Sequence, residues 1–292
     1  MKTLITGASG QLGRELLRIK PDKWRFIAFS HSELDISDSA AVAAVFQKHK
    51  PNLVINAAAY TSVDQAESER EKAFAVNAVG AENIARATEY FRARLIHIST
   101  DFIFDGTKSQ PYLPDDRPNP IGVYGASKLQ GEKAVLETTG NQALILRTGW
   151  VYSSHGSNFV ITMLRLMTER DEIGIVADQV GTPTWARDLA RTIYRFADFP
   201  SAQGVFHWSD AGVAGWYDFA VAIQEEAREI GFPLKNTTIK PIRTADYPTP
   251  AKRPAYSVLD KTATWETLGY TSLHWRDSLR SMLAELKELN HA

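Results

Sequence analysis

Short apolar runs alternate with longer segments of helical periodicity through the first half of the chain. The apolar runs have the length of a buried strand and are apolar nearly throughout, as parallel strands covered on both faces are. In the segment 70–90, Ala73, Val76, Ala81 and Ile84 recur at helical spacing. This alternation predicts right-handed crossovers and an α/β fold with a doubly wound parallel sheet of the Rossmann type. The predicted strands are 3–6, 25–29, 53–56, 94–99 and 143–147, and the predicted helices are 11–19, 39–49, 70–90 and 127–137.

The pattern changes after about residue 150, and from about residue 201 the chain is richer in Trp, Pro and loops. This change predicts a dinucleotide-binding domain over 1–150, with about 183–200 returning to it. Residues 151–182 and 201–292 are expected to form a smaller, mixed α/β lobe that binds the substrate. Within this second half the predicted elements are a helix at 159–169, a short strand at 173–176 and a helix at 187–196.

The composition excludes several kinds of chemistry. The chain of 292 residues has no cysteine, which rules out disulfides, thiolate nucleophiles and cysteine-ligated metal sites. Its formal net charge is −1, so no basic field would attract nucleic acid or an anionic membrane. No segment approaches the roughly 20 apolar residues that span a bilayer, and the N-terminus lacks the apolar core of a signal peptide. We expect a soluble, cytoplasmic protein with neither a nucleic-acid nor a membrane partner.

A glycine-rich turn with the spacing G-x-x-G-x-x-G follows the first predicted strand and opens the first predicted helix. Glycines suit a tight turn whose backbone approaches a pyrophosphate, and the helix N-terminus offers free N–H groups and a positive dipole end. The alternative is a purely structural strand–helix turn. The predicted cofactor contacts in this turn are Gly7, Ser9, Gly10, Gln11 and Leu12.

The end of the second predicted strand bears on the choice of cofactor. An acid there would hydrogen-bond the adenosine ribose and repel a 2′-phosphate, but residues 29–32 read Phe-Ser-His-Ser. Ser30 and His31 would accommodate a 2′-phosphate, so NADPH is the predicted cofactor, with NADH possible. Asp35 and Ile36 are expected to flank the adenine ring, although Asp35 is equally consistent with a helix cap or turn carboxylate.

A candidate catalytic set follows the fourth predicted strand. Thr100 and Asp101 stand at the strand end, where open α/β sheets bind ligands. Tyr124 and Lys128 are four residues apart, which places them on one helix face. A nearby ammonium favours the phenolate, so Lys128 is expected to lower the pKa of Tyr124 and to hydrogen-bond the nicotinamide ribose. Thr100 would hold the substrate oxygen while Tyr124 protonates it. The alternative for the Tyr–Lys pair is a surface helix pair.

These segments resemble the extended short-chain dehydrogenase/reductase family, and within it the dTDP-4-dehydrorhamnose reductases. The glycine and Tyr/Lys motifs mark the superfamily only. The segments at 99–104, 178–184 and 250–254 are more specific to these reductases. The resemblance covers nearly the whole chain, through residues 7–13, 56–61, 63–67, 99–104, 124–128, 147–152, 158–159, 178–184 and 250–254.

The resemblance implies reduction at C4 of a dTDP-linked 4-keto-6-deoxy sugar in dTDP-rhamnose synthesis, with Thr100, Tyr124 and Lys128 as catalytic residues and Asp101 beside the sugar. It also implies Arg253 as a contact of the diphosphate and Asn158 as a contact of the nucleotide. Alternatives are a surface ion pair for Arg253 and a helix cap for Asn158. Further implied sugar contacts are Thr61, Val63, Phe102 and Trp150, the last alternatively a core anchor, and further cofactor contacts are Ala57, Ala58, Ala59, Tyr60 and Asn77.

One departure concerns metal binding. Some members of this family dimerise through magnesium held by glutamates, and Glu15 occupies a matching position. Arg187 stands where such a member has a glutamate, so we predict no metal. The expected partner is the dTDP-sugar substrate, and the chain is expected to be a monomer or a homodimer.

Two other functions fit the same fold. A non-catalytic NADP-binding regulatory subunit is one, because fold does not determine function, but such a protein has no need of the intact Thr100, Tyr124 and Lys128 set. Another 4-keto sugar-nucleotide reductase, epimerase or dehydratase is the second. An epimerase or dehydratase would retain tightly bound NAD, whereas a reductase exchanges its cofactor freely.

Overall fold

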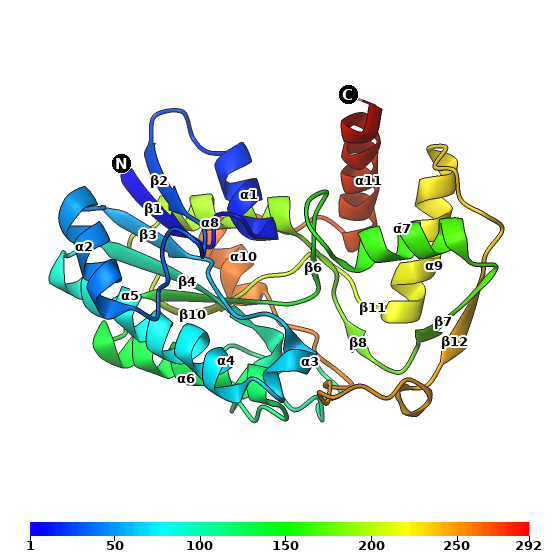
Figure 1. Cartoon of the computed structure of the whole chain (residues 1–292), viewed down its shortest axis with the longest axis horizontal. Coiled ribbons are helices and arrows are strands. Elements are labelled where there is room, and N and C mark those ends of the chain that lie inside the picture. Colours follow the sequence, from blue (N-terminus) through cyan, green and yellow to red (C-terminus); the bar gives the residue numbers. More distant parts are fainter. Residues whose placement is uncertain (292) are drawn as a thin grey trace.

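A six-stranded parallel sheet forms the centre of the larger lobe (Figure 1). The computed structural model describes residues 1–291, and the side chains of residues 1–289. All neighbouring strands run parallel, which confirms the predicted α/β fold with a doubly wound sheet. The strand order is β10-β5-β4-β3-β1-β2, with β1 at Lys2–Thr6, β2 at Arg25–Phe29, β3 at Leu53–Asn56, β4 at Arg94–Thr100, β5 at Leu144–Thr148 and β10 at Gly204–His207.

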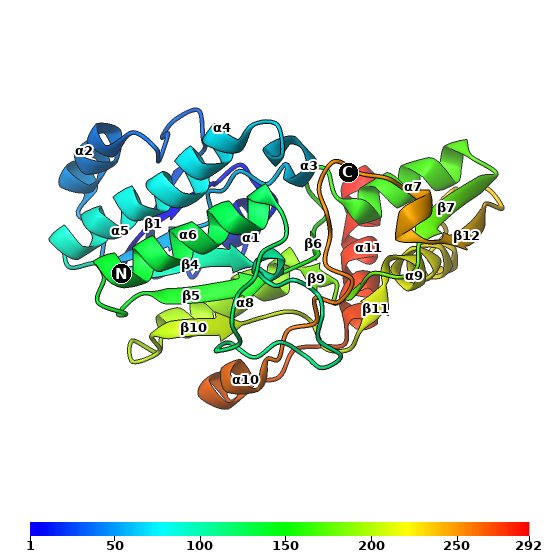
Figure 2. The ribbon, with the colours of Figure 1, turned by 90° about the horizontal axis from the view of Figure 1, so that it is seen from below.

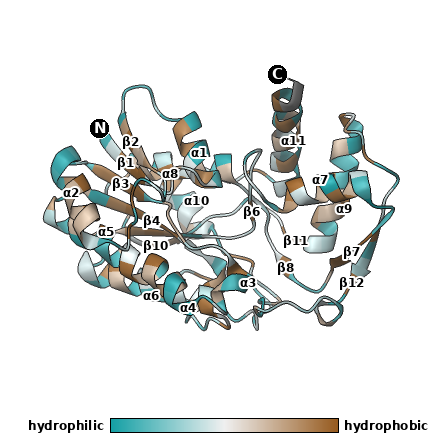
Figure 3. Ribbon diagram, viewed as in Figure 1, coloured by the Kyte–Doolittle hydropathy of each residue, from teal (hydrophilic) through white to brown (hydrophobic). Residues whose placement is uncertain are grey.

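Helices cover both faces of this sheet because successive strand residues point to opposite sides. Ile5 of β1 packs with α1 and α8, whereas Leu4 packs with α2, α5 and α6. Figure 2 shows α5 and α6 lying together along one face. In Figure 3 the central strands are largely hydrophobic, and hydrophilic residues gather on the outer sides of the helices. These helices are α1 (Gln11–Arg18), α2 (Ser39–His49), α5 (Ala81–Tyr90), α6 (Val123–Thr138) and α8 (Ala186–Ala197).

The predicted helix 70–90 is interrupted in the structure. It consists of α4 (Arg70–Phe74), a π-helical segment η1 (Ala75–Gly80) and α5. The wider turn contains Asn77, whose side-chain amide bonds to Tyr60 and to Ser127 rather than facing solvent. Periodicity alone could not reveal this, because a π-helical turn keeps the apolar face approximately in place.

A smaller lobe lies at one end of the sheet and has its own core. Its core residues come mainly from three helices and from a two-stranded parallel sheet of β7 and β12. No helix among residues 1–291 is both long enough and apolar enough to cross a membrane. The elements are β6 (Val151–Tyr152), α7 (Phe159–Glu169), β7 (Glu172–Val176), β8 (Val180–Gly181), β9 (Thr184–Trp185), β11 (Ala214–Gly215), α9 (Trp216–Glu229), β12 (Thr238–Ile242) and α11 (Trp275–His291).

The sheet includes one strand, β10, that lies outside the segment 183–200 expected to return to it. The change of pattern along the chain predicts residues from 201 onward in the smaller lobe, whereas β10 at 204–207 pairs with β5 of the larger lobe. Helix α10 (Thr262–Leu268) packs beside β10, and its Leu268 joins the core between the sheet and α8. β10 is a short apolar run, and its sequence does not indicate which strand it pairs with.

A buried ion pair fixes helix α6 against the sheet. Arg147 of β5 donates two forked hydrogen bonds to Glu132 of α6, at 3.0 and 2.8 Å, and both side chains are at most 4% exposed. The Arg147 guanidinium also donates to the carbonyl oxygen of Pro114. Because α6 carries Tyr124 and Lys128, this pair holds the helix that presents them at the sheet edge.

We therefore expect Arg147→Ala to lower the free energy of unfolding by about 3–5 kcal/mol, because it leaves the Glu132 carboxylate buried without a partner. Arg86→Ala is the control: its pair with Glu82 on α5 is exposed, so its loss should cost about 0–1 kcal/mol. Urea unfolding of the two variants measures both values. Equal losses in the two variants would contradict the proposed role of the buried pair.

Candidate active site

The turn after β1 has the geometry of an anion site. Gly7 has a φ of +72°, and a Cβ there would lie 2.6 Å from the carbonyl group of Ala57. A Cβ at Gly13 would lie 2.2 Å from the Gly7 oxygen, so the first turn of α1 can pack this closely only with glycine. Gly10 caps α1 without any side-chain hydrogen bond. The N–H groups of the helix end are therefore free to bind a diphosphate, and these residues fit a dinucleotide.

A row of side-chain hydrogen bonds crosses the sheet at the last residues of β1 and β3. The Thr6 hydroxyl donates to the Asn56 oxygen at 2.6 Å, and the Asn56 amide lies 3.0 Å from Nδ1 of His97. The Ala58 N–H also donates to Asn56, at 3.3 Å. This row thus holds the segment 57–60 beside the glycine turn.

Asn77 also holds the segment 57–60 in place, through hydrogen bonds to the backbone of Tyr60. Its side chain accepts from the Tyr60 N–H at 2.8 Å and donates to the Tyr60 oxygen and to the Ser127 hydroxyl, each at 3.0 Å. It is 1% exposed. The structure therefore places Asn77 as a support of the predicted cofactor segment, whereas Ala57, Ala58, Ala59 and Tyr60 are partly accessible.

The predicted catalytic residues converge at the ends of β4 and α6. The Thr100 hydroxyl lies 3.1 Å from the Asp101 carboxylate and is close enough to Tyr124 to lower the pKa of its phenol. Lys128 donates to the carbonyl oxygen of Ile98 in β4, at 2.7 Å. Phe102 packs its ring edge against Tyr124, with the ring centroids 5.5 Å apart. The surface-pair alternative for Tyr124 and Lys128 is wrong, because Lys128 is 2% exposed and donates to β4, and Tyr124 is only partly exposed beside Phe102.

Burial dominates the acid–base properties of this cluster. Burial and the nearby Asp101 carboxylate raise the pKa of Tyr124 to about 12. Burial lowers the pKa of Lys128 to about 8, and burial raises the pKa of Asp101 to about 6. The prediction that Lys128 lowers the pKa of Tyr124 is therefore wrong for this state of the chain. Loss of water around the phenol outweighs the ammonium, which hydrogen-bonds to the strand backbone.

Ser257 belongs to this cluster although the sequence analysis did not include it. Its hydroxyl is close enough to the Asp101 carboxylate to lower the pKa of that group, against the larger effect of burial. Its backbone N–H donates to the Val180 oxygen at 2.8 Å. On the other side, a Cβ at Gly149 would lie 2.5 Å from the Asp101 carboxyl carbon. The one signal in the sequence that could have indicated Ser257 is its position shortly after the segment 250–254.

Trp150, just after β5, and Trp216 form a pair of stacked aromatic rings, here called the aromatic wall. Trp150 has a φ of +51°, a left-handed conformation that a bulky side chain rarely adopts, and strain of this kind is often found at functional sites. It stacks on Trp216 of α9, with ring centroids 3.5 Å apart and planes 4° from parallel. Trp216 was not predicted, because its contact with Trp150 depends on the packing of the smaller lobe.

Two residues predicted to contact the nucleotide already have partners within the chain. Asn158 caps α7 by accepting from the Ile161 N–H at 3.2 Å, as its alternative interpretation proposes. Arg253 makes two hydrogen bonds to Asp64, at 3.1 and 2.8 Å. Asp64 belongs to the short helix α3 (Val63–Ala66), near the accessible Thr61 and partly buried Val63. The ion-pair alternative for Arg253 is therefore present in the structure.

Residues 29–32 contain no acid, but in the structure the carboxylate of Glu33 lies at the end of β2. The turn after Ser30 returns the Glu33 carboxylate to the Ser30 N–H at 2.8 Å and to its hydroxyl at 2.6 Å. His31 is exposed, and Asp35 accepts from Ser37. Ile36, predicted beside the adenine, is instead 2% exposed and packs against the backbone of Gly80.

Known proteins that resemble the chain identify its family. Residues 1–288 match the family model described as the RmlD substrate binding domain. The chain is 42% identical to a dTDP-4-dehydrorhamnose reductase of Aggregatibacter actinomycetemcomitans, over 97% of this chain and 98% of that protein. It is 40% identical to that of Escherichia coli strain K12, over 98% of each. The chain belongs to the RmlD family.

Solved structures agree with this membership, which confirms the predicted resemblance. A dTDP-4-dehydrorhamnose reductase of Clostridium acetobutylicum superimposes with a TM-score of 0.92 at 40% identity, over 98% of this chain and all of that one. The reductase of Bacillus anthracis, solved in complex with NADP, gives 0.92 at 38% identity over 97% and 99%. A UDP-glucose 4-epimerase of Thermus thermophilus at 19% identity shares the fold alone, with a TM-score of 0.79.

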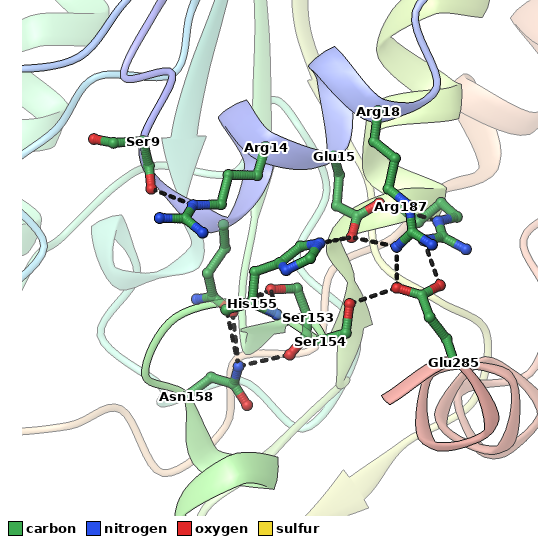
Figure 4. Close-up of polar contacts among 11 residues, drawn as sticks. Ser9, Arg14, Glu15, Arg18, Ser153, Ser154, His155, Asn158, Arg187 and Glu285 are labelled. Atoms are coloured by element: carbon green, nitrogen blue, oxygen red, sulfur yellow. Dashed lines mark hydrogen bonds and ion pairs between the residues drawn. The ribbon is translucent and has the colours of Figure 1, made fainter. Parts of the chain in front are cut away.

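In this RmlD-family chain a cluster of charges joins α1 to α8 and α11 (Figure 4). The buried Glu15 accepts from Arg187 at 3.0 Å, and Glu285 pairs with both Arg187 and Arg18. With His155, whose Nε2 is 3.7 Å from Glu15, the two carboxylates bring three potential metal ligands within 4.8 Å of one another. Two guanidinium groups, those of Arg18 and Arg187, pair with the two carboxylates.

The same region contacts the cofactor turn. Gln11, the first residue of α1, accepts from the Asn158 amide at 3.1 Å and from the Ser153 hydroxyl at 3.2 Å. The Ser154 hydroxyl in turn donates to Glu285. Figure 4 shows Ser153, Ser154 and His155 between α1 and Glu285 of α11. The loop 153–158 thus connects the smaller lobe to the start of the helix whose N-terminus is the predicted phosphate site.

We predict a pH-dependent contribution of Asp101 to stability. Its pKa rises from an ordinary value of 3.8 to about 6 on folding, so the folded chain binds this proton more tightly than the unfolded chain. The contribution is complete below pH 4 and is lost as the pH rises through 6. Relative to Asp101→Asn, the wild type should lose about 3 kcal/mol of unfolding free energy between pH 4 and pH 7.

Urea unfolding at several pH values measures this difference. Asp22→Asn, at an exposed position, is the control and should track the wild type throughout. A difference between wild type and Asp101→Asn that stays constant from pH 4 to pH 7 would rule out the raised pKa.

Proposed function

We propose that the chain reduces the C4 keto group of dTDP-4-dehydro-L-rhamnose to dTDP-L-rhamnose, with NADPH as the hydride donor and NADH as a second donor. The observation that carries this proposal is the grouping of Thr100, Tyr124 and Lys128 at the end of β4: the Tyr124 ring packs on Phe102, and the buried Lys128 donates to the carbonyl oxygen of Ile98. The chain that has this arrangement is about 40% identical in sequence, over nearly its whole length, to dTDP-4-dehydrorhamnose reductases.

The cofactor residues fit a dinucleotide along the carboxyl edge of the sheet. The free N–H groups at the start of α1 would hold the diphosphate, and Lys128 lies where it would bind the nicotinamide ribose. When bound, NADPH supplies the hydride. The other residues that would hold it are Gly7, Ser9, Gly10, Gln11, Leu12, Ala57, Ala58, Ala59 and Tyr60.

Tyr124 is suited to donating a proton to the sugar oxygen. With a pKa near 12 the phenol is fully protonated at neutral pH, which is the form that reduction of a carbonyl requires. As C4 gains a hydride, its oxygen takes the phenolic proton, and a phenolate remains on Tyr124. The Lys128 ammonium on the same helix stabilises that phenolate, and Thr100 holds the oxygen by its hydroxyl.

The sugar and its diphosphate would lie between the two lobes. Asp101 and Phe102 border Tyr124, Trp150 contributes the aromatic wall, and Thr61 and Val63 lie after β3. Arg253 would contact the diphosphate by exchanging its Asp64 carboxylate for phosphate oxygens, because both anions match a guanidinium fork. Asn158 acts through Gln11 instead, since its amide already hydrogen-bonds within the chain.

The test is oxidation of NADPH and of NADH with dTDP-4-keto-6-deoxy-L-lyxo-hexose generated in the assay. We expect turnover, with dTDP-L-rhamnose as the product identified by mass and by chromatography against a standard. Cofactor binding without any turnover would overturn the rhamnose assignment and direct the search to other 4-keto sugar nucleotides.

Tyr124→Phe should reduce kcat by roughly two to four orders of magnitude, the usual contribution of general acid catalysis. The ring and its packing on Phe102 are kept, so cofactor affinity measured by calorimetry should remain as in the wild type. Tyr90→Phe, at a residue 81% exposed on the far end of α5, is the control and should retain full activity. A Tyr124→Phe enzyme with most of the wild-type turnover would refute the role of the phenol.

A further inference from the structure

We propose that Glu33 determines how far the enzyme prefers one nicotinamide cofactor over the other, by placing a carboxylate at the adenosine end of the cofactor site. This inference rests on the dinucleotide site proposed above. It assigns to Glu33 a favourable interaction with the free 2′-hydroxyl of NADH and a repulsive one with the 2′-phosphate of NADPH.

The end of β2 lies directly beside the glycine turn. Thr6, the last residue of β1, is in register with Phe29, the last residue of β2. The Ala8 N–H of the turn donates to the Phe29 oxygen at 2.9 Å. Whatever follows Phe29 therefore stands next to the phosphate-binding backbone, where doubly wound folds bind the adenosine ribose.

The chain after Phe29 folds back tightly, and this brings Glu33 to that position. The N–H groups of Glu33 and Leu34 both donate to the Ser30 oxygen, at 3.2 and 3.0 Å. The Glu33 carboxylate then accepts from the N–H and the hydroxyl of Ser30 through the same oxygen, Oε2. These contacts fix the carboxylate at the strand end and leave Oε1 without a partner among the hydrogen bonds of this turn.

The carboxylate is charged and exposed. Hydrogen bonds from Ser30 lower the pKa of Glu33, so the group is ionised at neutral pH. An ionised carboxylate can only accept hydrogen bonds, which suits a ribose hydroxyl and opposes a phosphate. Among the neighbouring side chains, Asp35 adds a second negative charge and His31 is exposed.

The guanidinium of Arg14 acts in the opposite direction. It donates to the Ser9 oxygen in the glycine turn at 3.0 Å and is exposed (Figure 4). Its positive charge favours any phosphate bound at this turn. With Glu33 and Arg14 opposing each other near the adenosine end, we expect the wild type to use both cofactors, and Glu33 to set the ratio.

The experiment compares wild type with Glu33→Gln, which keeps an oxygen acceptor for Ser30 and removes the charge. Calorimetry of NADP⁺ and NAD⁺ binding to the purified protein gives the affinity ratio without any substrate. Steady-state rates with NADPH and NADH give the corresponding ratio of kcat/KM. Asp22→Asn, an exposed residue near the opposite end of β2, makes the same change in net charge and is the matched control.

We expect Glu33→Gln to shift both ratios about tenfold toward the phosphorylated cofactor at low salt, since one charge facing a doubly charged phosphate across roughly 5 Å of water is worth about that much. The shift should shrink at high ionic strength and should appear in KM rather than in kcat. Asp22→Asn should leave both ratios unchanged.

Ratios in Glu33→Gln within twofold of those of Asp22→Asn would overturn the proposal, as would a shift toward NAD⁺. Thermal unfolding of the variant excludes a loss of fold as the cause. If the enzyme turned over no keto sugar at all, the proposed reaction would fail, but the calorimetric ratios would still decide the role of Glu33.

Discussion

The hydrogen-bonded row of Thr6, Asn56 and His97 holds the functional edge of this molecule together. It joins β1, β3 and β4 at one level of the sheet, in a region that water does not reach. Buried polar side chains are costly unless they are paired, so the row permits only one register of these three strands. The glycine turn, the segment 57–60 and the Thr100-Asp101 pair all begin within a few residues of it. Their mutual positions follow from strand pairing, not from the loops themselves.

Exclusion of water also sets the chemistry at that edge. Lys128 and Asp101 are buried and Tyr124 is only partly exposed, and each pKa moves in the direction that favours the neutral form. A phenol that keeps its proton suits reduction, in which the enzyme donates a proton rather than removing one. The Arg147–Glu132 ion pair contributes to this chemistry indirectly, because it fixes α6, the helix that carries Tyr124 and Lys128.

Many helices and strands of both lobes could be predicted from the sequence. The strands β2 and β3 and the helices α2 and α7 have the predicted bounds, and most other elements differ by one or two residues. Apolar runs and helical periodicity reflect local burial, which each segment carries in its own residues. The π-helical turn at Asn77 was missed because it arises from a contact with Tyr60 and Ser127, and β10 was assigned to the other lobe because an edge strand does not specify its partner.

The sequence by itself determined the fold class, the glycine turn and the Tyr124–Lys128 spacing, because these depend on residue type and on distance along one strand or helix. Only the tertiary structure decided the protonation of Tyr124, the pairing of Arg253 with Asp64, and the return of Glu33 to Ser30. Each of these depends on which groups meet across the fold and on how much water remains between them. Ser257 and Trp216 reach the site for the same reason: packing of the smaller lobe against the sheet brings together residues that lie 60 or more positions from their partners in the chain.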